Sequence, residues 1–95
     1  MASDYGNLGI LAQTRGNLEQ AEEYYTQALA LNKELGRKEG MANQYANLGI
    51  LAKTRGNVPA ARAYWQQSVD LFQQIGMPHM VEKVRGWLDA LPPDS

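Results

Sequence analysis

The stretch YGNLGILAQTRGN, residues 5–17, recurs as YANLGILAKTRGN at residues 45–57, 40 residues further along the chain. Of the thirteen positions, two differ: Gly6 corresponds to Ala46, and Gln13 corresponds to Lys53. A nearly identical phrase at a fixed spacing indicates a structural unit that is used more than once and stacks on its neighbours. We therefore expect a repeat protein.

Length and composition narrow the classes of partner. The 95 residues suffice for one small domain, and nine Lys and Arg against ten Asp and Glu leave a net charge of −1. Such a balance gives no strong field to attract nucleic acid or anionic lipid. The chain has no Cys, and no segment approaches the roughly 20 apolar residues that cross a bilayer. We expect a cytoplasmic protein that has neither nucleic-acid nor membrane partners.

Apolar residues recur at intervals of three and four, as in Leu18, Ala21 and Tyr25, which is helical periodicity. The Gly-Asn pairs at 16–17 and 56–57 are typical of a helix end followed by the N-cap of the next helix. The predicted helices span residues 2–15, 18–35, 40–55, 58–75 and 79–91. Short connections between them favour antiparallel hairpins.

The last predicted helix has no partner after it. Its apolar residues are in register with those of residues 41–51, but the segment LPPDS that follows does not continue a helix. We therefore predict a single domain, residues 1–95. It consists of one repeat over 2–38, a second over 42–78 and a capping helix over 79–91.

This pattern resembles the tetratricopeptide repeat, whose motif is W-x2-L-G-x2-Y followed by A-x3-F. The matching residues are Tyr5, Leu8, Gly9, Ala12, Ala21 and Tyr25 in the first copy, and Tyr45, Leu48, Gly49, Ala52, Ala61 and Trp65 in the second. The resemblance covers residues 2–91 and implies an all-α, right-handed α-solenoid in which these residues, Leu8 included, form the core. The 40-residue period resembles the longer repeats of kinesin light chains, Pins-type scaffolds and bacterial multi-repeat proteins.

A second stripe lies opposite the motif residues when each residue advances by ~100°. Its members are Ser3, Asn7, Ile10 and Thr14 in the first copy, and Asn43, Asn47, Ile50 and Thr54 in the second. The resemblance implies that this stripe lines a concave surface, where Asn7 and Asn47 hold the backbone of an extended peptide. Gln13 and Lys53 are expected near the edge of this surface, where Lys53 favours an acidic ligand. The alternative is that Asn7 and Asn47 satisfy hydrogen bonds between helices.

Trp87, the two arginines of the phrase and the single histidine are further candidates for a functional role. Trp87 is in register with Asn47 and is either an aromatic platform at the end of the surface or, the favoured interpretation, a core residue. Arg15 and Arg55 either offset the dipole of a helix end or bind a ligand carboxylate. His79 is the only histidine in the chain and is expected to be exposed.

No catalytic constellation, metal-binding cluster or phosphate-binding loop is recognisable in the sequence, so we expect neither an enzyme nor a cofactor. The predicted function is a scaffold that binds a protein or an extended peptide on its concave face. One alternative is a self-associating fragment of a longer repeat array, because no preceding helix covers the outer side of the first predicted helix; this alternative implies a homo-oligomer. The other is a regulatory part of a larger signalling protein.

Overall fold

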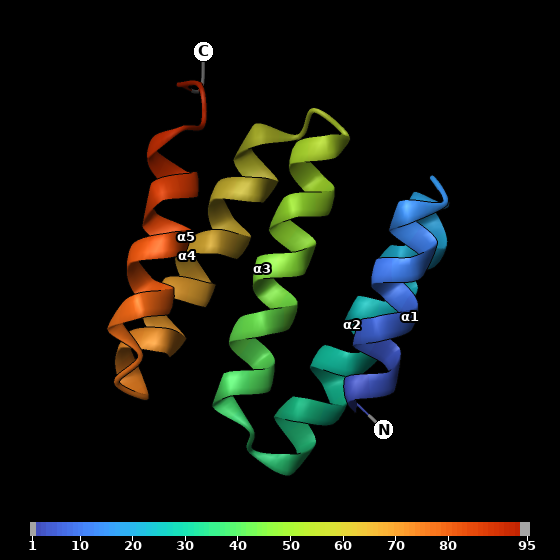
Figure 1. Cartoon of the computed structure of the whole chain (residues 1–95), viewed down its shortest axis with the longest axis horizontal. Coiled ribbons are helices and arrows are strands. Elements are labelled where there is room, and N and C mark those ends of the chain that lie inside the picture. The colour runs from blue at the N-terminus through green and yellow to red at the C-terminus, as the bar shows by residue number, and fades with distance from the viewer. Residues whose placement is uncertain (1, 94–95) are drawn as a thin grey trace.

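The computed structural model describes residues 2–93, with side chains from Tyr5 onward. The described chain folds into α1 (Ala2–Thr14), α2 (Leu18–Leu35), α3 (Lys38–Thr54), α4 (Val58–Gln74) and α5 (Pro78–Asp89), and residues 2–93 contain no strand (Figure 1). The predicted all-α fold is confirmed. Each predicted helix boundary lies within two residues of the observed one.

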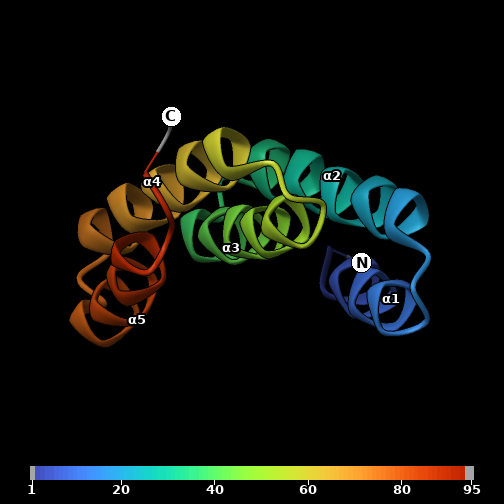
Figure 2. The ribbon, with the colours of Figure 1, turned by 90° about the horizontal axis from the view of Figure 1, so that it is seen from above.

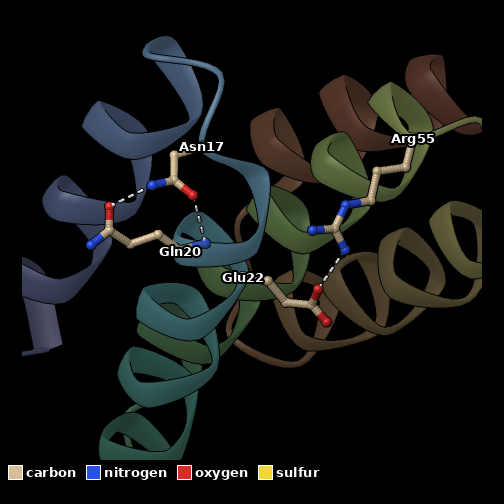
Figure 3. Close-up of polar contacts among 4 residues, drawn as sticks. All are labelled: Asn17, Gln20, Glu22 and Arg55. Atoms are coloured by element: carbon tan, nitrogen blue, oxygen red, sulfur yellow. Dashed lines mark hydrogen bonds and ion pairs between the residues drawn. The ribbon is translucent and has the colours of Figure 1, made fainter.

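A glycine with positive φ follows each of the first four helices. Their φ angles are 81° at Gly16, 69° at Gly36, 77° at Gly56 and 70° at Gly76. The left-handed conformation, which is strained for residues with a Cβ, explains why glycine recurs here every 20 residues. After Gly16, Asn17 is the N-cap of α2, as predicted. Its side chain accepts a hydrogen bond from the backbone N–H of Gln20 (Figure 3).

The helices form two layers along an arc. Figure 2 shows α1, α3 and α5 on the inner side of the arc and α2 and α4 on its outer side. Each helix packs against the next one in the chain, in the order α1, α2, α3, α4 and α5. The inner layer therefore brings together the helices that carry the predicted ligand-contacting stripe.

Two large rings form the centre of the hairpins. The Tyr25 ring packs against Gly9, where an added Cβ would lie 2.5 Å from the ring, and Trp65 packs against Gly49 in the same way at 2.3 Å. Trp65 Nε1 donates a hydrogen bond to the carbonyl oxygen of Ala46 at 3.0 Å. In each hairpin, an aromatic ring of the second helix thus packs against a glycine of the first helix, as the motif predicts.

Contrary to the expectation from the motif, Leu8 is not a core residue. Leu8 is 41% exposed, whereas its equivalent Leu48 is 4% exposed. The difference arises from neighbours, because Leu48 of α3 packs in the cluster that includes Tyr25 and Leu29 of α2. No helix of the described chain covers the corresponding side of α1.

Candidate functional site

A depression of about 380 Å³ lies among residues of the inner-layer helices. Its lining comes from α1, α3 and α5, with Asn32 added from α2. The α1 residues that line it are Gly6, Asn7 and Ile10. Residues of three helices that are separate in sequence therefore line one depression.

Uncommitted amide groups line much of this depression. Asn7 and Asn43 are exposed, and their side chains form no hydrogen bond within residues 5–93. Asn47 is partly buried, and its Nδ2 donates to Gln44 Oε1 of the same helix at 3.4 Å, a long contact. Hydrogen bonding between helices therefore does not explain Asn7 or Asn47. Both amides have donor and acceptor capacity that a peptide backbone can use.

Four of the ten predicted contact residues line the depression, namely Asn7, Ile10, Asn43 and Asn47. Five others lie outside its lining: Gln13, Thr14, Ile50, Lys53 and Thr54. The side chain of Ser3, the tenth, lies outside the described residues.

Hydrogen bonds within the fold occupy three of the residues outside the lining. Gln13 Oε1 accepts a hydrogen bond from the hydroxyl of Tyr25 at 2.9 Å. Burial raises the pKa of this hydroxyl, so it stays protonated as the donor. Thr14 and Thr54 donate their hydroxyls to the carbonyls one turn earlier, those of Ile10 and Ile50.

The last helix contributes two lining residues that the sequence analysis did not select, Met80 and Lys83, and a third, Trp87, for which it favoured a core role. Met80, Lys83 and Trp87 of α5 all line the depression. Trp87 is half-buried, with its ring centroid 5.5 Å from that of Trp65, so it both packs on the core and faces the depression. The 40-residue repeat spacing could have identified two of these residues, because Lys83 follows Asn43 by 40 residues and Trp87 follows Asn47 by 40.

Gln44 is another residue of the lining that the sequence analysis did not select. Its side chain is buried and lies between α1 and α3, where a Cβ added to Gly6 would be 3.1 Å from Gln44 Nε2. The equivalent of Gly6 in the second copy is Ala46. The glycine therefore leaves space in which the Gln44 amide approaches α1 closely, beneath Asn47.

Among the residues whose side chains the structure describes, from Tyr5 to Pro93, Lys83 is the only ionisable residue that lines the depression. Lys83 Nζ lies 5.6 Å from the centroid of the Trp87 ring. A cation beside an apolar aromatic surface can accommodate a ligand that carries both a carboxylate and an apolar group. The α5 end of the depression therefore differs in chemistry from the amide-rich α1 and α3 side.

The described part of the chain offers no grouping of His, Cys, Asp and Glu side chains suited to holding a metal ion. Nor does it contain a helix with the length and apolar character needed to cross a membrane.

The arginines near the end of the two copies of the phrase have different surroundings. Arg55 forms an ion pair with Glu22 of α2 (Figure 3). Arg15, the equivalent residue after α1, is exposed and forms no ion pair with any residue from 5 to 93. Neither arginine lines the inner depression.

A family model of the tetratricopeptide repeat matches residues 1–79. Comparisons with curated proteins and with solved structures give no significant match. The matched region includes both copies of the repeated phrase and all four helices of the two hairpins. Proteins of this family are non-catalytic repeat scaffolds that mediate contacts between proteins. The chain belongs to the tetratricopeptide repeat family.

Proposed function

We propose that this domain binds an extended peptide segment of a partner protein along the inner depression. The observation that carries the proposal is the depression lined by α1, α3 and α5, in which the Asn7 and Asn43 amides form no hydrogen bond to any residue from 5 to 93. An amide offers a donor and an acceptor together, so it pairs with a peptide bond whatever the side chain of that residue. The asparagines thus provide affinity that is independent of ligand sequence.

Selectivity for particular peptides arises at the α5 end. Met80 and Trp87 offer apolar surface to one side chain of the ligand, and Lys83 attracts a carboxylate beside it. The preferred ligand therefore combines an apolar or aromatic residue with an adjacent Asp or Glu. Lys53, which lies outside the depression, adds to this preference only through longer-range attraction.

A peptide selection followed by binding measurements tests the proposal. Random 12-residue peptides displayed on phage are selected on the immobilised domain. Fluorescence anisotropy then measures the affinity of a recovered, labelled peptide. We expect Asn7→Ala/Asn47→Ala to weaken binding about tenfold, because each lost amide hydrogen bond contributes about 0.5–1.5 kcal/mol. A second peptide selection, performed on the Lys83→Gln variant, should recover fewer peptides that contain Asp or Glu.

A matched control separates binding from stability. Gln67 is an exposed amide on α4, outside the depression, so Gln67→Ala should leave peptide affinity unchanged. Thermal unfolding of every variant is followed by circular dichroism. Equal affinity of the wild type and the double asparagine variant would contradict the proposal. So would a loss of more than about 1 kcal/mol of stability in Asn47→Ala, since it would assign this amide a structural role.

A further inference from the structure

The internal repeat shows what covers one particular stripe of the first helix in a repeat. In α3 this stripe consists of Leu48, Leu51 and Arg55, spaced three and four residues apart. Leu48 and Leu51 are buried in the cluster that contains Tyr25 and Leu29 of α2. Arg55 ends the stripe by pairing with Glu22, on the second turn of α2 (Figure 3). An antiparallel amphipathic helix with an acid near its N-terminus therefore covers the stripe.

The same stripe on α1 is open. Its residues are Leu8, Leu11 and Arg15, identical in type and spacing to those of α3, and we call it the α1 stripe. Leu11 is 45% exposed, whereas Leu51 is 2% exposed. Three of the four large apolar residues that are exposed among the described side chains lie on α1: Leu8, Ile10 and Leu11. Ile10 lines the inner depression, so the α1 stripe is a separate surface at the end of the arc.

We propose that the α1 stripe docks an amphipathic helix of a partner protein that carries a carboxylate in its first two turns. The α2 helix is the template for this partner, because α2 already covers the identical stripe of α3. The docked helix runs antiparallel to α1, buries its apolar side on Leu8 and Leu11, and places its carboxylate beside Arg15. This inference is independent of the inner depression.

Neither α2 nor α4 of a folded second copy is free to dock in this way, and the exposed side of its α5 carries charged residues, among them Lys83 and Arg85. Its α2 already lies between α1 and α3, and its α4 lies between α3 and α5. Moreover, α4 carries Arg62 at the position of Glu22, so stacking α4 on the α1 stripe would bring two cations together. Arg62 instead donates to the carbonyl of Pro92 after α5. Charge complementarity therefore favours a separate acidic helix.

A synthetic peptide of residues 17–36, labelled with fluorescein and carrying the whole of α2 with its Asn17 cap, serves as the probe. We expect saturable binding to the domain, measured by fluorescence anisotropy. Leu8→Glu/Leu11→Glu should weaken this binding by about tenfold or more, because both leucines lose their buried contact. Leu35→Glu changes an exposed leucine of α2 outside the stripe and should leave it unchanged.

A charge exchange tests the orientation of the docked helix. Arg15→Glu in the domain should weaken binding of the unmodified peptide about fivefold, and a peptide with Glu22→Arg should restore it. Because Arg15, Leu8 and Leu11 are exposed, these variants should keep the helicity of the wild type. Arg15→Glu should lower the melting temperature slightly, because a carboxylate near a helix C-terminus opposes the helix dipole. Restoration by the exchanged pair is a result that non-specific hydrophobic binding does not produce.

Three results would overturn the assignment. The first is absence of peptide binding. The second is equal binding by the wild type and Leu8→Glu/Leu11→Glu, which would mean that the peptide occupies another site or displaces the chain's own α2. The third is a dimer in sedimentation velocity that Leu8→Glu/Leu11→Glu dissociates, since a second copy would then cover the stripe.

Discussion

The two copies of the repeated phrase have nearly the same sequence but different surroundings. In residues 45–57 both leucines of the stripe are buried, and in residues 5–17 the identical leucines are exposed. The copies agree in their contacts within the hairpin, because Gly9 and Gly49 each lie against a ring of their partner helix. The phrase therefore encodes how a hairpin closes, whereas burial between hairpins depends on which helix stands beside it.

The largest expected effect comes from truncating the equivalent leucines. Leu48→Ala removes a buried side chain and should cost about 2–5 kcal/mol of unfolding free energy, enough to unfold much of a domain of this size. Leu8→Ala should change that free energy by less than about 0.5 kcal/mol, since Leu8 is exposed. Chemical denaturation followed by circular dichroism measures both values.

Similar losses at Leu48 and Leu8 would contradict the difference in burial. The control for helix propensity is built into this pair, because both changes are Leu→Ala within a helix and share the same intrinsic term. The pair thus isolates the contribution of the neighbouring helix α2.

The fold was largely predictable from the sequence, because periodicity and turn chemistry act locally. The Gly-Asn pairs mark helix boundaries that the structure has within two residues, and the two motif rings lie on the two motif glycines as expected. The prediction failed at Leu8, where the outcome depends on a neighbour and not on the local sequence. A repeat pattern assigns a core position on the assumption that both sides of the helix are covered.

The candidate site was less predictable, because a groove is a property of several helices together. One-helix geometry placed Asn7 and Asn47 on one stripe, and both line the depression. It placed Thr14 and Thr54 on the same stripe, but the threonine hydroxyls bond to their own helices outside its lining. Lys83 follows Asn43 by 40 residues, but the helix that carries it was interpreted as a cap, so Lys83 was not assigned to the surface.

An intermediate effect is expected from adding a methyl group at the two motif glycines. Gly49→Ala would place a Cβ 2.3 Å from the Trp65 ring and should cost about 1–3 kcal/mol, since Trp65 is buried and its Nε1 hydrogen bond to Ala46 must shift. Gly9→Ala should cost less, because α1 packs chiefly on α2 and has room to move away from Tyr25. Urea unfolding of the two variants compares them.

A greater loss for Gly9→Ala than for Gly49→Ala would mean that the end helix α1 is held as firmly as α3. Near-ultraviolet circular dichroism provides an independent readout, because displacement of the Trp65 ring changes its signal even where the stability change is small. Gly86→Ala is a matched control, since no heavy atom lies within 4 Å of a Cβ added there.

The smallest expected effect is a difference in stability between substitutions of the two equivalent arginines of the phrase. Arg15 and Arg55 both stand just after a helix, so each interacts with the negative end of a helix dipole and that contribution is common to both. Only Arg55 pairs with Glu22, and both partners are partly exposed to solvent. Arg55→Gln should therefore cost about 0.2–1 kcal/mol more than Arg15→Gln in low salt, with the difference decreasing as salt screens the pair. If Glu22→Gln leaves that difference unchanged in a double-mutant cycle, the ion pair is not its source.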